Sequence, residues 1–475
     1  MEPVKIVPPN HKKCSDPTCG CHRVDIPVYN FYNPPTSTGD PQQDSFLPPK
    51  RNNLFYRILR AVLPSLIALS VCLKIRAVVI DELKKVIDCG NPEKGGSFLV
   101  CPGCGEQKFV PFTCKSRFCP SCGNLYNMQR LSAVSDVLFD VSHYHITFTF
   151  DERLRRYFLI DHDALNDLFD AARETLLDYY MGGLKDLDTT VHKRGKKKRK
   201  NKRRKIYIPG IILVLHTFGR DLKWNPHIHV LCTKCALDEN DVWHEFKFIS
   251  YTYLHKVFMY KIIAKLRKRF KSKDFHKLTN QIIKDHPDGF HVHVDDIDKV
   301  ETDPKEDSSL KKVMKYIGRY LGRPPIAMSR IDQFDEDTHM VTFHYLPHEP
   351  HEELGPGEPM YETLHMLCFA LRLIRHIPEP QFKMIRYAGI YSTVRQRSMP
   401  RAFKKQHLLF KSGSHAKRQL FSHWRGAYYR AYRIDPVECP NCHKIMERLY
   451  IRIGKEKYWI HKKYPPIPWS QYKNI

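Results

Sequence analysis

Apolar residues recur along the chain with two different spacings, and each spacing predicts a different element. Between Asn53 and Ile87 they recur every three to four positions, which predicts two helices leading into Cys89, with Pro64 breaking or kinking the pattern. Residues 144–150 alternate polar and apolar side chains, as in a half-buried strand. Further strands are predicted at 209–219, 227–235 and 290–296, weaker ones at 328–331 and 340–345, and helices at 125–139, 251–284, 310–321 and 362–375.

The order of these elements predicts an α+β fold on an antiparallel sheet. Residues 1–50 are expected to form a poorly ordered arm with extra cysteines, and residues 51–135 a helical lead-in and a small Cys-rich domain. Residues 140–345 are expected to carry the sheet, flanked by helices and interrupted by a basic insertion at 190–206. Residues 346–475 are expected to form a basic, partly helical C-terminal region.

Charge narrows the class of partner. The 475 residues include 78 Lys and Arg against 51 Asp and Glu, a formal net charge of +27, which favours a polyanion and above all nucleic acid. We expect no membrane partner, because the most apolar stretch, Ala61 to Leu73, is shorter than the roughly 20 residues that a span needs. We also expect no nucleotide cofactor, since no phosphate-loop motif is present.

The 15 cysteines fall partly in Cys-x-x-Cys pairs, a spacing that favours metal over disulfides. Cys101 with Cys104 and Cys119 with Cys122 match the two knuckles of a structural zinc site. Four thiolates close the coordination shell, so this zinc would build a fold and take no part in catalysis. Cys89 and Cys114 would serve a second ion or a shared cluster.

Other cysteines carry weaker signals. Cys439 and Cys442 have the spacing of one knuckle, but the sequence offers no evident partners for them. Cys232 and Cys235 are interpreted as ordinary strand residues. A small extra metal site in the N-terminal arm would use Cys14, Cys19, Cys21 and His22.

Two histidines, His227 and His229, lie on a predicted strand. Residues two apart on a strand point to the same face, so both imidazoles would form half of an open metal site. Such a pair is weak evidence when taken alone, and the chain has a second pair, His291 and His293.

Two tyrosines, Tyr316 and Tyr320, stand four residues apart on a predicted helix and therefore share a face. Arg319 and Arg323 form an adjacent basic row suited to DNA phosphates. By itself this pattern fits an ordinary amphipathic helix better than an active site. The basic run containing Lys196, Lys197, Lys198 and Arg199 would contact phosphates without reading sequence, or would be merely a solvated loop.

The combination and order of these features resemble the rolling-circle insertion-sequence transposases, the two-tyrosine branch of the HUH endonucleases. The resemblance extends from about Cys89 to about Arg397. It rests on CPGCGEQKFVPFTCKSRFCPSCG, YHITFTF, LHTFGRDLKWNPHIHV, YIGRYLGRPPIAMSRI and HIPEPQFKMIRYAGIYS.

The resemblance implies an HUH-type nuclease domain that nicks and joins single-stranded DNA at insertion-sequence ends through 5′-phosphotyrosine intermediates. Tyr316 and Tyr320 would be the nucleophiles, and His227 and His229 would hold Mg²⁺ or Mn²⁺, leaving His291 and His293 as plain strand residues. A third ligand is expected among His145, His216 and Asp221. The Cys-rich domain would recognise the element's ends, and the protein would be cytoplasmic and associated with a bacterial nucleoid.

Three other functions stay open at this point. A plasmid replication initiator or relaxase would use the same histidines and a tyrosine. A zinc DNA-binding protein without catalysis would need only the cysteines. A carboxylate-triad nuclease would use Asp295, Asp296 and a distant Glu, and would form no covalent adduct with DNA.

Overall fold

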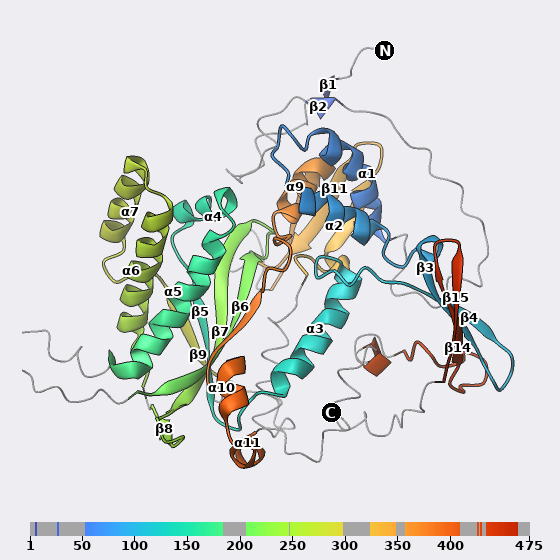
Figure 1. Cartoon of the computed structure of the whole chain (residues 1–475). Helices are drawn as coiled ribbons and strands as arrows, with labels where there is room; N and C mark the ends of the chain where they lie inside the picture. The colour runs from blue at the N-terminus through green and yellow to red at the C-terminus, as the bar shows by residue number, and fades with distance from the viewer. Residues whose placement is uncertain are drawn as a thin grey trace, which may run out of the picture.

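The computed structural model describes residues 53–183, 206–246, 248–297, 324–347, 357–408, 425–426, 428–429 and 434–463, together with the short paired strands β1 (Lys5–Ile6) and β2 (Ile26–Pro27). Figure 1 shows a large sheet with helices packed against it, a helical lobe over a smaller sheet, and a third sheet on the opposite side of the molecule. Helix α3 (Pro120–Ser135) runs between these parts. The α+β class with antiparallel sheets is thereby confirmed.

The large sheet has the strand order β13-β6-β7-β5-β9, with every neighbouring pair antiparallel and β8 added alongside β7. Its central strand, β7, alternates Ile228 and Val230, which are fully buried, with His227 and His229 on the opposite face. The strands predicted at 144–150, 209–219, 227–235 and 290–296 are all present. The six strands of this sheet are β5 His143–Phe148, β6 Ile208–Phe218, β7 Trp224–Leu237, β8 Trp243–Glu245, β9 Val292–Asp296 and β13 Ile385–Gly389.

Helices cover the apolar face of this sheet and form its main core. They are α4 (Tyr157–Ile160), α5 (Ala164–Asp178), α6 (Tyr251–Arg269) and α7 (Lys273–Asp285). The single helical stretch expected over 251–284 is wrong, because the chain breaks after α6. Ser272 starts α7 by accepting a hydrogen bond from the backbone N–H of Phe275, the usual role of an N-cap serine.

One end of the opposite face is also apolar and packs against α3, α11 (Arg401–His407) and Met399, which follows α10 (Thr393–Ser398). Tyr391 is buried in this second core, where its hydroxyl lies 2.7 Å from Nε2 of His143. The rest of that face carries the histidines described below, so the sheet separates an apolar core from a polar surface.

The helical lobe packs α1 (Leu54–Ala68), α2 (Ala77–Ile87) and α9 (Met366–Ile374) over a three-stranded sheet. Its strands are β10 (Ile331–Asp335), β11 (Met340–Tyr345) and β12 (Met360–His365). The helix expected at 362–375 is wrong in its first four residues, which belong to β12. The Thr363 hydroxyl lies 2.9 Å from that of Thr342 across the β11/β12 pair, and such cross-strand pairing outweighs a local helical pattern.

Two helices form between Asn53 and Ile87 as predicted, but Pro64 does not separate them. Helix α1 continues through Pro64, and the break falls between Leu69 and Arg76. Pro64 has no N–H to donate to the Arg60 carbonyl. Both residues are exposed, so water can reach that carbonyl.

The third sheet joins segments from both halves of the chain. Its order is β15-β14-β3-β4, with β3 (Gly95–Val100) and β4 (Gln107–Pro111) from the Cys-rich segment. Strands β14 (Glu447–Ile453) and β15 (Glu456–Lys462) come from the C-terminal region. Residues 346–475 thus supply β12 to the three-stranded sheet, β13 to the large sheet, and β14 and β15 to the four-stranded sheet. Among the described helices, none has the length and apolar composition to span a membrane.

Two side chains of the helical lobe, Arg372 and His376, contact the turn that precedes β7. Arg372 on α9 is completely buried, and its guanidinium donates to Glu362 over 2.7 and 2.9 Å. The same group lies 3.4 Å from the carbonyl of Asp221. His376 adds a second tie, with Nε2 3.0 Å from the Leu222 carbonyl. These contacts fix the turn from which the two strand histidines extend.

We expect Glu362→Gln to lower the free energy of unfolding by about 3 kcal/mol, because it leaves a buried guanidinium without its counter-charge. The matched control is Glu336→Gln, whose pair with Arg57 is exposed and should contribute less than about 1 kcal/mol. Denaturant unfolding of both variants tests this difference. Equal losses would show that the Arg372 pair does not anchor the lobe.

Candidate metal centre and cysteine clusters

Three imidazoles meet on the polar face of the large sheet. His227 and His229 project from β7, and His216 on β6 is the direct cross-strand partner of His227. One nitrogen from each of the three lies within 4.8 Å of the others, the spacing of groups that can share an ion. Among the expected third ligands, His216 is therefore the one that completes the set.

The nitrogens of the strand pair face each other. Nε2 of His227 lies 3.1 Å from Nε2 of His229, and the ring centroid of His216 lies 4.6 Å from that of His229. Three nitrogen ligands leave room in a coordination shell for oxygen atoms of water or substrate, which is typical of catalytic rather than structural sites.

Outer hydrogen bonds fix the orientation of these rings. Nδ1 of His227 lies 2.7 Å from the carbonyl oxygen of Asn225, so Nδ1 must carry the proton and Nε2 the lone pair. Nδ1 of His229 lies 3.0 Å from Nε2 of His145, and Nδ1 of His145 lies 3.2 Å from Asp295. If each Nδ1 donates, the chain from Asp295 through His145 leaves the His229 lone pair on Nε2 as well.

His293 also joins this outer shell, with Nε2 2.7 Å from Asp295. The second histidine pair is thus more than plain strand sequence, although only one of its members takes part. His291 lies farther along the edge strand and contributes its backbone carbonyl to Thr149.

Burial favours the neutral form of His229 and of its outer partner His145. It lowers the pKa of His229 well below the ordinary histidine value, and the neighbouring His216, His227 and His145 lower it further. Burial also lowers the pKa of His145 to about 4, against the opposing effect of Asp295. Neutral imidazoles have a lone pair to offer a cation, so the site is prepared for a metal at neutral pH.

The remaining candidate ligands lie apart from the three imidazoles. His145 reaches only the far nitrogen of His229, which makes it an orienting partner. Asp221 binds the backbone and ammonium groups of Lys223 in the turn. Asp295 and Asp296 are adjacent on β9 and have separate partners, Asp296 pairing with Lys234, so they do not form the paired carboxylates of a carboxylate-triad nuclease.

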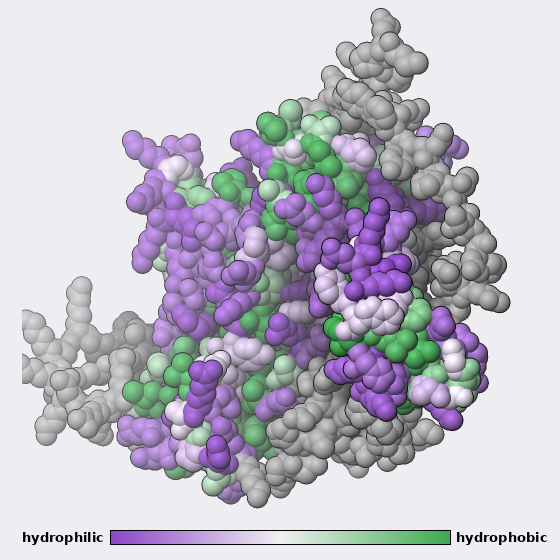
Figure 2. All heavy atoms as spheres, turned by 45° about the vertical axis from the view of Figure 1, so that its right-hand side comes forward, coloured by the Kyte–Doolittle hydropathy of each residue, from purple (hydrophilic) through white to green (hydrophobic). Residues whose placement is uncertain are grey.

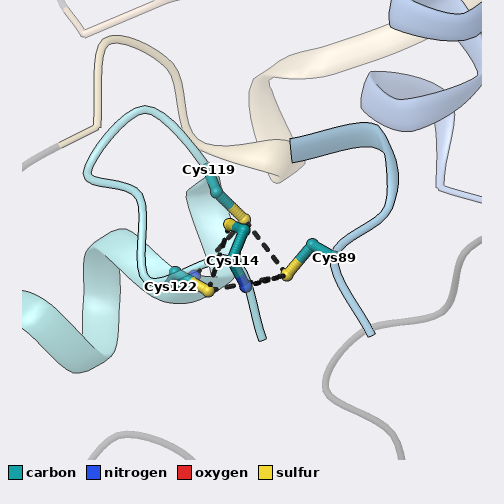
Figure 3. Close-up of side chains that lie close together, drawn as sticks. All are labelled: Cys89, Cys114, Cys119 and Cys122. Carbon is teal, nitrogen blue, oxygen red and sulfur yellow. Dashed lines mark hydrogen bonds between the residues drawn. The ribbon is translucent and has the colours of Figure 1, made fainter. Parts of the chain in front are cut away.

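One cluster of cysteines surrounds the base of the β3/β4 hairpin and contains Cys89, Cys114, Cys119 and Cys122. Figure 3 shows the four sulfurs turned toward one another. Cys122 lies 3.5 Å from both Cys89 and Cys114, and Cys119 lies 3.8 Å from Cys89. A tetrahedral zinc with 2.3 Å bonds places its sulfurs about 3.8 Å apart, so the spacing suits this ion.

A second cluster contains Cys101, Cys104, Cys439 and Cys442. Cys101 lies 3.4 Å from Cys442, and Cys104 lies 3.5 Å from Cys439. The backbone N–H of Gly103 and the neighbouring thiols lower the pKa of Cys101 to about 6 despite the opposing effect of burial. This lowered pKa favours the thiolate form of Cys101, the form that zinc binding requires.

The grouping of Cys101, Cys104, Cys119 and Cys122 around one ion is wrong. Cys101 and Cys104 lie at the tip of the hairpin, whereas Cys119 and Cys122 lie at its base. Strands of five and six residues separate tip and base by about 15–20 Å, too far for one ion. Cys89 and Cys114 complete the basal cluster, and the C-terminal knuckle completes the one at the tip.

Several expected site residues lie outside the described part of the chain. These are Tyr316, Tyr320, Arg319, Arg323, the basic run Lys196, Lys197, Lys198 and Arg199, and the N-terminal Cys14, Cys19, Cys21 and His22. Cys232 is buried on β7, and neither it nor Cys235 belongs to a metal-type grouping of described residues.

Comparison with known proteins assigns both regions. Residues 210–398 match a family model described as "Putative transposase", and residues 58–150 match "Transposase zinc-binding domain". The transposase for insertion sequence element IS801 of Pseudomonas savastanoi pv. phaseolicola is 28% identical over 331 residues, 66% of this chain and 70% of that protein. "Putative transposase y4qJ" of Sinorhizobium fredii is 21% identical over 364 residues, 75% of this chain and 85% of that protein. No solved structure matches the chain.

The chain is a transposase similar to those of the IS91 insertion sequences. The segment matching the transposase model contains the three imidazoles, and the zinc-binding segment contains the whole basal cysteine cluster. This similarity implies an enzyme that binds DNA, cleaves it and transfers strands. The cysteine clusters of this transposase fit structural zinc.

We expect the purified transposase to contain two zinc ions per chain, one in each cluster. Cys439→Ser/Cys442→Ser should reduce the content to one, because two thiolates do not hold zinc tightly enough to survive purification. Cys72→Ser, an exposed cysteine outside both clusters, is the control and should keep two. Elemental analysis of the protein measures the content.

Unchanged zinc after removal of the C-terminal knuckle would contradict this division. That result would mean that Cys101 and Cys104 find their partners elsewhere.

Proposed function

We propose that this transposase nicks and rejoins single-stranded DNA at insertion-sequence ends through 5′-phosphotyrosine intermediates, as in rolling-circle transposition. The observation that carries the proposal is the set of three clustered imidazoles, His216, His227 and His229, on one face of the central strands. The likeness to the IS801 transposase supports it.

The proposed nucleophiles are Tyr316 and Tyr320. A phenol oxygen attacks the scissile phosphorus, forms a Tyr–phosphorus ester and breaks the bond from phosphorus to O3′. The phenolic proton is lost to solvent, and the departing O3′ takes up a proton, giving a 3′-hydroxyl. Because one phosphoester replaces another, the bond energy is retained for rejoining, and two tyrosines allow two successive strand exchanges.

The imidazole set would hold a divalent ion on the path of the scissile phosphate. Bound there, the ion would supply Lewis-acid stabilisation of charge on the phosphate oxygens. His216, His227 and His229 would hold that ion, and Asp295 and His145 orient His229. Among the described residues the set offers three imidazoles and no carboxylate, which favours Mn²⁺ over Mg²⁺ because Mg²⁺ prefers oxygen ligands.

We expect Asp295→Asn to weaken Mn²⁺ binding about 10- to 100-fold, since loss of an outer partner of a ligating histidine has effects of this size. Its matched control is Asp296→Asn on the same strand, whose carboxylate pairs with Lys234 away from the imidazoles. His229→Ala should remove binding altogether. Titration of Mn²⁺ followed by electron paramagnetic resonance measures the affinity, and equal values for both Asp variants would contradict the orienting role.

A covalent adduct with DNA tests the tyrosine chemistry. Labelled single-stranded DNA from the element's ends is incubated with Mn²⁺ and analysed on a denaturing gel. We expect an adduct with the wild type, none with Tyr316→Phe/Tyr320→Phe, and none with His229→Ala. Tyr458→Phe, an exposed tyrosine on β15, is the control and should form the adduct normally.

An adduct that persists in the double tyrosine variant would overturn the assignment of the nucleophiles. With verified end sequences, DNA binding without any adduct would favour a zinc DNA-binding protein that has no catalytic step.

A further inference from the structure

A row of aromatic rings crosses the four-stranded sheet that joins residues 95–111 to residues 447–462. Trp459 on β15 pairs with Tyr450 on β14, Tyr450 pairs with Phe98 on β3, and Phe98 pairs with Phe109 on β4. All four side chains therefore project from one face. None belongs to the histidine site or to either cysteine cluster.

The central pair of this row is stacked. Phe98 and Tyr450 lie 4.7 Å apart between ring centroids with an interplanar angle of 7°. Trp459 continues the row at 5.1 Å from Tyr450, with its ring tilted by 59°. Gly96 makes room on the same face, since a Cβ there would fall 2.4 Å from the Val110 carbonyl oxygen and 2.7 Å from the Phe109 ring. The row is thus a built feature of the sheet.

The row ends in solvent. Trp459 lies on the edge strand, and 72% of its surface is exposed, whereas the inner rings are half-buried. An indole left this open loses the burial that usually accounts for tryptophan on a sheet. Its exposed ring surface is open to contact with one more flat ring.

Cations flank the row. Arg452 lies beside Phe109, with its guanidinium carbon 4.6 Å from the ring centroid, and the ammonium of Lys457 lies 5.2 Å from the centre of Tyr450. Residues 447–463 hold six Lys and Arg against two glutamates, and one of these, Glu447, is bonded to His461. In Figure 2, which brings this side forward, apolar and strongly polar side chains lie next to each other.

We propose that this face, the aromatic row with Arg452 and Lys457, is a binding platform for single-stranded DNA on which an unpaired base stacks against Trp459. Unpaired bases offer the flat ring that the row lacks, and the cations match the phosphates of the backbone. Paired bases in a duplex are already stacked on both sides and fit the row less well. The proposal rests on the proposed action on single-stranded DNA. It adds a DNA-binding surface built from segments of the sequence far from the three imidazoles.

The platform depends on the second cysteine cluster. Strand β3 leads directly to Cys101, and β14 begins five residues after Cys442, so zinc at that cluster would hold the inner pair of strands together. A ligand-binding face composed from both ends of the chain then forms only in the metal-loaded protein.

The test uses the full-length, zinc-loaded transposase carrying Tyr316→Phe/Tyr320→Phe, which prevents cleavage. Fluorescence anisotropy compares a 20-nucleotide oligo(dT) with an abasic strand of the same length. We expect Trp459→Ala to weaken oligo(dT) binding about 5- to 100-fold and to leave abasic binding unchanged, because only stacking needs the base. Tyr458→Ala, the exposed neighbour on the other face of β15, should change neither affinity.

Equal oligo(dT) affinity in the Trp459→Ala and Tyr458→Ala variants would overturn the platform and leave the β15 edge as a surface for a protein partner. Zinc content and melting temperature should match in both variants, since a loss confined to Trp459→Ala would mean that the indole only stabilises the sheet.

Adduct formation separates this proposal from the enzymatic one. On a background with Tyr316 and Tyr320 intact, Trp459→Ala should form the adduct at saturating DNA but need a higher DNA concentration. Normal adduct formation by Trp459→Ala at every DNA concentration would contradict the platform alone. Absence of adduct with the wild-type protein would contradict the tyrosine mechanism.

Discussion

The two-residue repeat of the central strand β7 is the constraint on which the site depends. Ile228 and Val230 must enter the main core, so His227 and His229 are forced onto the opposite face with the same spacing. Antiparallel pairing then puts His216 beside His227 and His145 within reach of His229. A shift of one residue in the register of β7 would move the imidazoles into the core. It would disrupt both the core packing and the imidazole site. Core packing and metal geometry are therefore specified together.

Burial has a cost that the surrounding hydrogen bonds offset. A cationic imidazole would be unstable at His229, where neighbouring histidines add repulsion to the loss of water, and this keeps the lone pair available. Asp295 lies at the rim of the sheet and is half exposed, so its charge reaches the buried rings only through His145. The polarity of the site thus declines inward, from a partly solvated carboxylate to the buried, neutral imidazole of His229.

Local pattern was enough to predict β5, β6, β7, β9 and the histidine pair, because alternation along one strand reports directly which face is buried. The strand expected at 328–331 is wrong, since Met328–Arg330 form a short 3-10 helix. The choice of His216 among three candidates needed the β6/β7 register, which no local pattern contains. The cysteine grouping failed for a related reason. Sequence spacing favoured joining Cys101 and Cys104 to the next knuckle, whereas the hairpin carries them to its tip, where partners from residues 439 and 442 meet them. Strand β12 was missed because its pairing with β11 outweighs helical spacing.

The cluster at the hairpin tip also has an energetic consequence for the whole chain. Bringing Cys104 and Cys439 together closes a loop of more than three hundred residues, but the entropic cost grows only with the logarithm of loop length. Zinc bound by four thiolates contributes free energy on the order of 10 kcal/mol, well above that cost. Pairing of β14 with β3 can then add the apolar contacts of Leu99, Val437 and Met446 rather than having to close the loop alone. The composite sheet is best understood as a product of metal binding. Its exposed aromatic row forms only when β14 has paired with β3.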